Sequence, residues 1–340
     1  MITKEEFKKY CIFHNLKYKF DSDDISEDLL DFLESDWNND NFSKVVKWLI
    51  KIFKENGKMI NIHVCDEYLF RECCENGSLE VAKWLMKISK KNGKIIDVHA
   101  CDEFAFKFSC FHGHIEVAKW LIEISKENGE TINIHTGNDA AFKYSCENGY
   151  IEIAKWLFKV SKKNGEMLNI HTKDEYAFCF SCCNGRLEVA KWLMKISKKN
   201  GNMIDIHMKN EAIFRRICEL EQLEIAKWLI EISKENNDMI NIHANDEEAF
   251  RYSCRFGQIE VVKWLMKISK ENGKMINIHA GNEYAFRSSC IFGNIEVAKW
   301  LCSLCDDYYI EIENNEIVKH GIKNIIQGKD GSDRRGIKHR

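Results

Sequence analysis

The sequence predicts an all-α solenoid in which helix-turn-helix units stack with a 36-residue period. Three observations predict it. Lys-Trp-Leu recurs at a constant step, through Trp48, Trp84, Trp120, Trp156, Trp192, Trp228, Trp264 and Trp300. Columns of His, Phe and Cys recur at the same step, and a fixed period of this kind is typical of stacked repeats. The 340 residues also contain no proline, the residue that most often breaks helices.

The chain divides by composition and by the repeat. Residues 1–40 have mixed charge, and we predict an N-terminal helical cap there, because terminal repeats need a polar outer face. Residues 41–301 are the predicted repeat array, with one degenerate unit and then seven units that start at Asp66. Glu221 stands where six units have glycine, so we expect an irregular turn there. Residues 302–327 are a predicted C-terminal capping segment, and residues 328–340 a predicted disordered basic tail.

One unit, Asp246 to Gly281, illustrates the elements. Asp246 precedes two acids and is expected to be the N-cap of a first helix, helix A. Helix A ends near Gly257, and an apolar stripe at positions 261, 262, 265 and 268 predicts a second helix, helix B, over residues 259–270. Asn272 and Gly273 close helix B, and residues 275–279 are expected to run extended into the next unit.

Residues 113–121 read Gly-His-Ile-Glu-Val-Ala-Lys-Trp-Leu. They resemble the ankyrin repeat, whose second helix typically begins Gly-His-Leu-Glu-Val-Val-Lys-Leu-Leu. The lack of proline and the richness in Ile, Lys and Asn are similar to the ankyrin arrays of giant DNA viruses of the mimivirus kind. The resemblance implies an ankyrin-repeat solenoid with degenerate capping repeats, which acts by binding a partner. The usual Thr-Pro-Leu-His is replaced by runs such as residues 284–287, Tyr-Ala-Phe-Arg, so the inter-repeat hydrogen bonds of that tetrapeptide need a substitute.

Charge and motifs exclude several functions. Lys and Arg number 50 against 53 Asp and Glu, a balance that favours neither nucleic acid nor an anionic membrane. The N-terminus has no apolar signal segment, and no apolar run approaches the roughly 18 residues of a membrane span. No phosphate-binding loop and no nucleophile motif occurs. We therefore predict a cytoplasmic, monomeric, non-enzymatic protein that uses no cofactor and no membrane.

Regular His and Cys columns suggest a metal or redox site, but their spacing opposes one. Packed helices lie about 8–10 Å apart, so equivalent residues of neighbouring units are too distant to share a zinc ion or a disulfide. We predict no metal site. The His column is expected to connect or cap the hairpin turns by hydrogen bonds, and the Cys column is expected to be core. The Trp column is expected to be core or to pack, partly buried, at the surface of helix B.

Positions that differ between units are the candidates for function. One helix A position carries four aromatic residues, and the ankyrin pattern places it on the concave side. Beside it runs a mostly basic column that begins at Arg71. Aromatic and Arg side chains are enriched at protein interfaces. The predicted partner-binding residues are Phe108, Tyr144, Phe180, Tyr252, Lys107, Lys143, Arg215, Arg251 and Arg287.

Two interpretations of these residues remain open. In one, the aromatic side chains only cover the exposed side of helix A. In the other, they form a groove for an acidic, partly apolar segment of a protein partner, and the variable hairpin tips add contacts. The predicted function is thus a protein-binding scaffold or adaptor. Alternatives are a ubiquitin-ligase adaptor, a structural virion component, or a nucleic-acid-binding array, which is disfavoured because acids such as Glu103 and Glu247 lie beside the basic column.

Overall fold

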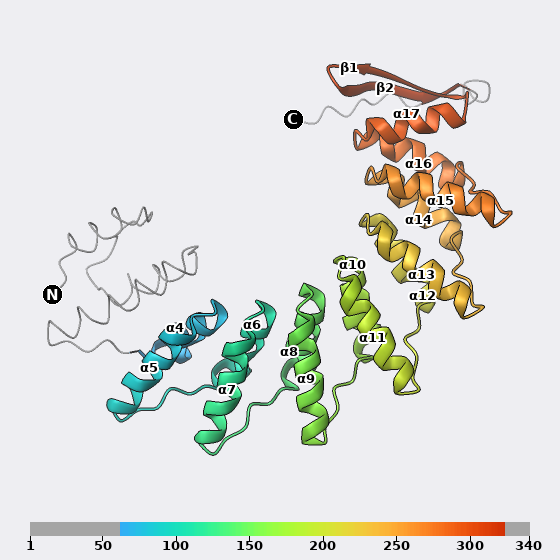
Figure 1. The fold of residues 1–340 in the computed structure, drawn as a ribbon. Helices are drawn as coiled ribbons and strands as arrows, with labels where there is room; N and C mark the ends of the chain where they lie inside the picture. Colours follow the sequence, from blue (N-terminus) through green and yellow to red (C-terminus); the bar gives the residue numbers. More distant parts are fainter. Residues whose placement is uncertain (1–61, 324–340) are drawn as a thin grey trace, which may run out of the picture. The chain divides into compact units, whose positions relative to one another are not determined.

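A computed structural model describes residues 62–323 of the chain (Figure 1). They belong to two compact bodies that divide between Phe178 and Cys179. We call residues 62–178 the N-terminal body and residues 179–323 the C-terminal body. The predicted N-terminal cap, most of the degenerate first unit and the predicted basic tail lie outside the described residues.

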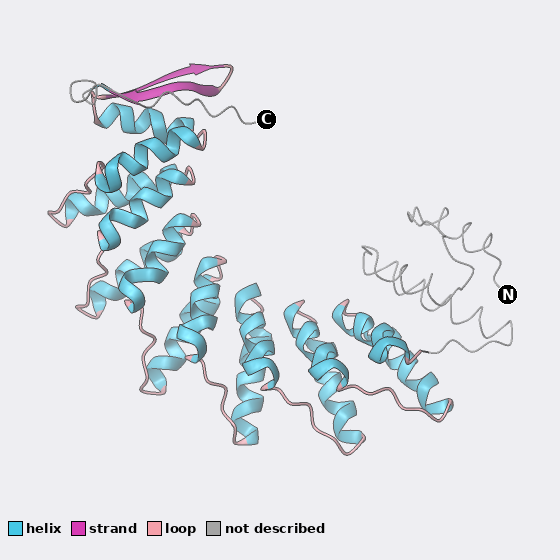
Figure 2. Ribbon diagram, turned by 180° about the vertical axis from the view of Figure 1, so that it is seen from behind, coloured by secondary structure: helices cyan, strands magenta, loops and turns pink. Residues whose placement is uncertain are grey.

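Each repeat contains two α-helices, which confirms the predicted all-α solenoid of helix-turn-helix units (Figure 2). The helices A are α4 (Val64–Glu75), α6 (Ala100–Phe111), α8 (Thr136–Asn148), α10 (Thr172–Cys183), α12 (Met208–Glu219), α14 (Ala244–Arg255) and α16 (Ala280–Ile291). The helices B are α5 (Leu79–Lys91), α7 (Ile115–Glu127), α9 (Ile151–Asn164), α11 (Leu187–Lys199), α13 (Leu223–Glu235), α15 (Ile259–Glu271) and α17 (Ile295–Leu304). Within the bodies, α4, α6 and α8 pack in series, as do α12, α14 and α16.

The start of each helix A corrects the predicted N-cap. In the α14 repeat Asn245, Asp246 and Glu247 have φ angles of 52°, 58° and 61°, so three successive residues form a left-handed turn. Asp246 is the middle residue of this turn and does not cap the helix. Asp and Asn enter the left-handed region more readily than other residues with side chains. This preference accounts for their recurrence at the position.

In each body the core lies between the helices and continues from repeat to repeat. Seven phenylalanines, one in each helix A, are almost fully buried: Phe70, Phe106, Phe142, Phe178, Phe214, Phe250 and Phe286. Phe106 lies 6.4 Å from the Trp156 ring of the next repeat, and Phe250 lies 6.4 Å from Trp300 in the same way. These tryptophans are partly exposed, so the prediction that the Trp column packs at the surface of helix B is confirmed.

The turn at Glu221 is regular, so the predicted irregularity is absent. Glu221 adopts a φ of 60°, close to the 78° of Gly257 in the next repeat. The N–H of Gln222 donates to the carbonyl oxygen of Ile217 at 2.9 Å, and Gln258 makes the equivalent bond to Ser253 at 2.9 Å. Because the Glu221 side chain is exposed, the turn bears only the backbone cost of a left-handed residue.

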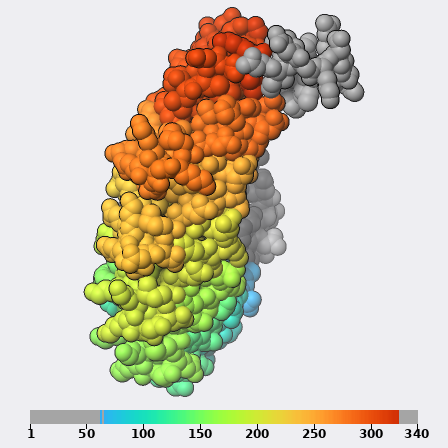
Figure 3. All heavy atoms as spheres, turned by 90° about the vertical axis from the view of Figure 1, so that its right-hand side faces the viewer, coloured from blue at the N-terminus to red at the C-terminus, as the bar shows by residue number. Residues whose placement is uncertain are grey.

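A β-hairpin follows the last helix within the predicted C-terminal capping segment. Strands β1 (Tyr308–Glu313) and β2 (Glu316–Ile322) pair antiparallel and contact α17 and α16. The Tyr308 ring stacks on Phe286 with 4.1 Å between centroids, and its hydroxyl donates to Glu283. Figure 3 shows the repeats of the C-terminal body as successive layers, from yellow to red. Through the ring and the hydroxyl of Tyr308, the hairpin covers the open end of the last repeat.

Candidate functional site

A column of acids, which the sequence did not single out as buried, connects neighbouring repeats. In the α14 repeat, His243 donates from Nδ1 to both carboxylate oxygens of Glu247, at 2.9 Å each. The same carboxylate accepts the backbone N–H of Asn277 from the next repeat, at 3.2 Å. Equivalent inter-repeat bonds join Glu67 to Asp97, Glu103 to Asn133, and Glu211 to Asn241. The predicted structural role of the His column is confirmed, with the buried acid as its partner.

The pKa of His207 gives this network a pH dependence. Burial by itself lowers the pKa of His207, but the hydrogen bond to Glu211 and the charges of Glu211, Asp238 and Asp205 together raise it above the ordinary value of 6.5. The protonated ring is therefore favoured in the folded chain. Its stabilising contribution is fully present below the unfolded pKa and is lost as the pH rises through the folded pKa.

We therefore expect the stability difference between the natural chain and the variant His207→Gln to narrow as the pH rises from about 5.5 to 8. Urea denaturation at several pH values measures it. In the control Asp238→Asn, one of the charges that raise the pKa is removed, so the pH slope should become shallower. A difference that is independent of pH, or that widens towards pH 8, would contradict the expectation.

The Cys column is buried, as predicted for core residues: Cys74, Cys110, Cys146, Cys182, Cys218, Cys254 and Cys290. Burial raises the pKa of each of these thiols, that of Cys290 to about 12. Because the thiolate is the reactive form, these side chains are poor nucleophiles at neutral pH. They fill space in the core.

The arginines of the basic column make hydrogen bonds and ring contacts within their own chain. Arg251 donates from Nε to the carbonyl oxygen of Asp246 at 2.6 Å and from Nη2 to that of Asn245 at 3.0 Å. Arg215 holds its own left-handed turn in the same way and also pairs with Glu248 of the next repeat. On the other side, the Arg251 guanidinium lies 5.2 Å from the centroid of Tyr284. These arginines therefore stabilise the left-handed turns of their own repeats and contact the following repeat.

The two predicted lysines are also covered. Lys107 donates to Asp102 at 3.0 Å, and only 15% of its side chain is exposed. Lys143 is buried, 5.6 Å from the centroid of Tyr176, and this burial lowers its pKa. Arg287, in the last repeat, is exposed. Among the predicted basic residues, Arg287 thus presents the most open side chain to a partner.

The four predicted aromatic residues fall in two groups. In the N-terminal body Phe108 stacks on Phe104 at 4.1 Å, and Phe111 connects it to Tyr144, with centroid distances of 5.9 and 5.3 Å. Phe180 belongs to the C-terminal body and is 39% exposed. In the same body, Tyr252 stacks on Tyr284 at 5.7 Å. Both bodies therefore carry partly exposed aromatic rings on helix A.

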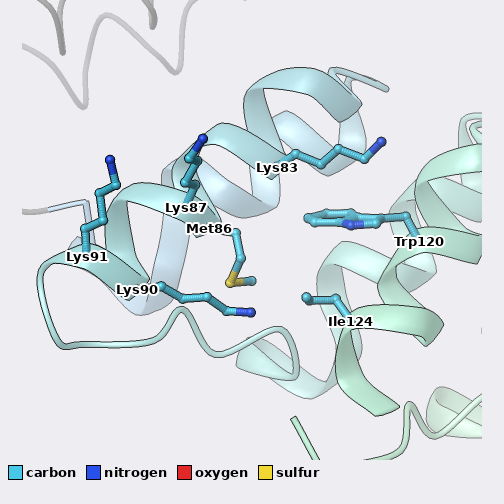
Figure 4. Close-up of a pocket in the computed structure, with 7 residues that line it drawn as sticks. All are labelled: Lys83, Met86, Lys87, Lys90, Lys91, Trp120 and Ile124. Carbon is cyan, nitrogen blue, oxygen red and sulfur yellow. The ribbon is translucent and has the colours of Figure 1, made fainter. Parts of the chain in front are cut away.

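A hollow of about 410 Å³ lies elsewhere, between the helices B α5 and α7. Met86, Trp120 and Ile124 line its apolar part, and lysines of α5 stand around it (Figure 4). The hollow is separate from the predicted helix A residues. One of its lysines, Lys83, pairs with Glu80 at 3.4 Å along the exposed side of α5.

Comparison with known protein families identifies the type of repeat. A family model of ankyrin repeats, which spans three copies, matches residues 69–167 and 106–210. The helix pairs and core columns of the matched residues continue through the C-terminal body. Residues 69–210 therefore match ankyrin repeats, and the other described repeats share their all-α solenoid fold. Ankyrin repeats are in general scaffolds for protein–protein interaction and typically have no enzyme activity.

Solved structures with a similar chain include two ankyrin proteins. The human ASB11 ankyrin repeat domain is 16% identical, with 64% of this chain and 95% of that chain covered and a TM-score of 0.40. An ankyrin repeat family protein from Legionella pneumophila is 17% identical, with 89% of each chain covered and a TM-score of 0.37. No curated protein sequence matches the chain. Within residues 62–323, no helix has the length and apolar character needed to cross a membrane.

Proposed function

We propose that the chain binds a partner protein through the surface of its helices A, as a scaffold or adaptor. The observation that carries the proposal is the helix A position that does not repeat. Where stacking fixes a residue, the column is constant, as for the buried phenylalanines. The position of Phe108, Tyr144, Phe180 and Tyr252 is free of that constraint and holds aromatic side chains in four repeats. Such rings supply large contact areas at interfaces.

The charge of this surface suggests the chemistry of the partner. Arg215, Arg251, Lys107 and Lys143 bind turns and rings of their own chain, yet they keep positive charge beside the aromatic positions, and Arg287 is exposed. The partner segment is therefore acidic and partly apolar. The composition, without proline and rich in Ile, Lys and Asn, resembles that of giant-virus ankyrin arrays, and on this resemblance we propose a host factor in the cytoplasm as the partner, bound by a monomer.

The test compares affinity capture from cells that naturally contain the protein, using the natural chain and two variants. The variant Phe108→Ala, Tyr144→Ala, Phe180→Ala, Tyr252→Ala should lose the captured partner. A matched variant replaces four exposed methionines of the connectors, Met167, Met203, Met239 and Met275, and should keep it. Both should retain the helical circular dichroism of the natural chain. Undiminished capture by the aromatic variant would refute the proposal.

Three observations separate the alternative functions. Ubiquitin-ligase subunits among the captured proteins would indicate a ligase adaptor. Recovery of the protein in purified virus particles would indicate a structural component. A nucleic-acid-binding array would bind oligonucleotides with an affinity that falls steeply as salt is raised.

A further inference from the structure

Large apolar side chains are exposed at the ends of the last two helices A. Phe256 is 47% exposed, Phe292 56% and Ile291 70%. Phe256 and Phe292 occupy a column in which the first four repeats have polar residues and the fifth has leucine, namely Asn76, His112, Asn148, Asn184 and Leu220. Stacking therefore does not require an aromatic ring at this position. Three exposed large apolar side chains on neighbouring helix ends indicate a contact surface.

Arg255 lies among these side chains. Its guanidinium is 5.4 Å from the centroid of Phe256 and 4.8 Å from that of Phe292, and Nη1 donates to the hydroxyl of Tyr284 at 2.8 Å. No carboxylate of residues 62–323 pairs with it. The nearby helix A arginines differ, because Arg215 pairs with Glu248 and Arg216 with Glu219. We call Arg255, Phe256, Tyr284, Ile291 and Phe292 the Arg255 patch.

The patch is held in one arrangement by its neighbours. The side-chain amide of Asn294 donates to the carbonyl oxygen of Arg255 at 2.6 Å, which ties the turn before α17 to the end of α14. Tyr284 is stacked on Tyr252 at 5.7 Å, and the Arg251 guanidinium lies 5.2 Å from the centroid of its ring. Side chains that are ordered before binding lose little conformational entropy on binding. The patch is therefore preorganised for a ligand.

We propose that the Arg255 patch binds a peptide segment of a partner protein in which a carboxylate stands beside a large apolar side chain. The carboxylate accepts hydrogen bonds from the Arg255 guanidinium, an arrangement that gives strong, directional bonds. The apolar side chain packs against Phe256, Phe292 and Ile291. The inference rests on the proposed protein-binding function and adds the location and the chemistry of one contact.

Charge and shape favour a peptide over a nucleic acid. A nucleic-acid backbone is bound by several cations spaced along the phosphates. Here one uncompensated guanidinium is surrounded by apolar side chains, while Arg251 is committed to the carbonyl groups of its turn. A single carboxylate next to an apolar group matches this pattern. Arg and large aromatic residues at the centre of a patch are also what energetic hot spots contain.

The experiment selects ligands for the full chain from a displayed library of random peptides. We expect the selected peptides to share an Asp or Glu within two residues of Phe, Trp or Leu. A fluorescent peptide of the shared sequence then gives affinities by anisotropy. Arg255→Gln should weaken binding about tenfold or more, as loss of a charge-assisted hydrogen bond implies. Replacing the peptide acid by its amide should weaken binding equally, and the two changes together should add little further.

Two further variants keep the test decisive. Arg216→Gln removes an arginine of the same body that already has a carboxylate partner, and should leave the affinity within about twofold. Phe292→Ala truncates an exposed ring, so it should preserve folding yet weaken binding several-fold. Circular dichroism and thermal unfolding check each variant. If Arg255→Gln does not fold, Arg255→Lys, which keeps the charge and loses the planar fork, takes its place with Phe292→Ala.

The outcomes are distinguishable. Selection of no peptide, selection of peptides without an acid, or undiminished binding by Arg255→Gln would each overturn the inference. Displacement of the peptide by a single-stranded oligonucleotide, with the same dependence on Arg255, would assign the patch to nucleic acid instead. If the four-residue aromatic variant loses its cellular partner while Arg255→Gln retains it, the proposed function stands and this inference fails.

Discussion

Replacing Phe250 with alanine is expected to lower the free energy of unfolding by about 3–5 kcal/mol, the usual cost of removing a large buried aromatic side chain. Phe250 is fully buried, and its ring contacts Trp300 of the next repeat. Helix α14, which carries it, packs on both α12 and α16. The cavity would thus weaken one repeat and its interfaces on both sides. In a solenoid those interfaces supply much of the stability.

Urea denaturation followed by circular dichroism and tryptophan fluorescence measures the effect. The matched control is Phe256→Ala, because Phe256 lies just after the same helix but is 47% exposed. The control should change the unfolding free energy by less than about 0.5 kcal/mol. Equal losses in the two variants, or a loss below about 1 kcal/mol for Phe250→Ala, would contradict the role of the Phe column as the centre of the core.

The repeat and its core could be predicted because stacking imposes the same requirement every 36 residues. Each helix A needs a large ring that reaches the next repeat, and the sequence shows it as Phe106, Phe250 and their equivalents. The left-handed turn could not be predicted in the same way. Asp and Asn are favoured both at helix N-caps and in left-handed turns, so Asp246 alone does not distinguish the two. The structure distinguishes them, because Arg251 donates hydrogen bonds to the carbonyl oxygens of Asp246 and Asn245 in the left-handed turn.

The burial of the acid column depends on a contact far along the chain. Glu247 follows Asp246 and has the charge expected at a helix start. Its actual second partner is the backbone N–H of Asn277, thirty residues later in the sequence. Because almost every residue has a backbone N–H, the sequence gives no sign of which one donates to the acid. The recurring His four residues before each acid was the available signal, because a His–acid pair at this spacing can form a hydrogen bond.

The C-terminal hairpin did leave a signal in the sequence. Residues 308–313 alternate partly between apolar and acidic side chains, and Asn314-Asn315 follows before a second short run. Two residues with positive φ form the preferred connection of a tight hairpin, and Asn314 and Asn315 have φ angles of 48° and 62°. The predicted role of this segment was capping only, and its strands were not predicted.

The candidate site was partly predictable. Variation between repeats directs attention to helix A, but the direction of the basic side chains depends on acceptors that only the folded turn creates. Arg215 and Arg251 reach carbonyl groups five and six residues earlier, which point outward because the turn is left-handed. Arg255 lies one helical turn further on, beyond reach of those carbonyls. It is therefore available to a ligand, as is the exposed Arg287.

Replacing Glu247 with alanine is the second change with a large expected effect, a loss of about 3 kcal/mol in the free energy of unfolding. The substitution leaves the Nδ1–H of His243 and the backbone N–H of Asn277 without their acceptor in a site that is closed to solvent. Each buried donor without a partner costs about 1–3 kcal/mol. The backbone conformation adds little, because alanine and glutamate bear a similar cost at positive φ.

Two variants separate the lost hydrogen bonds from the lost charge. Glu247→Gln keeps one carbonyl oxygen, so it can still accept one of the two donors and should lose about half as much stability. Glu260→Ala removes an exposed acid whose partner Lys263 lies 3.7 Å away, and such surface pairs contribute at most about 1 kcal/mol. Hydrogen exchange of the Asn277 amide reports the inter-repeat bond directly: it should accelerate in Glu247→Ala and stay slow in Glu260→Ala. If that amide remains protected in Glu247→Ala, the carboxylate is not what joins the two repeats.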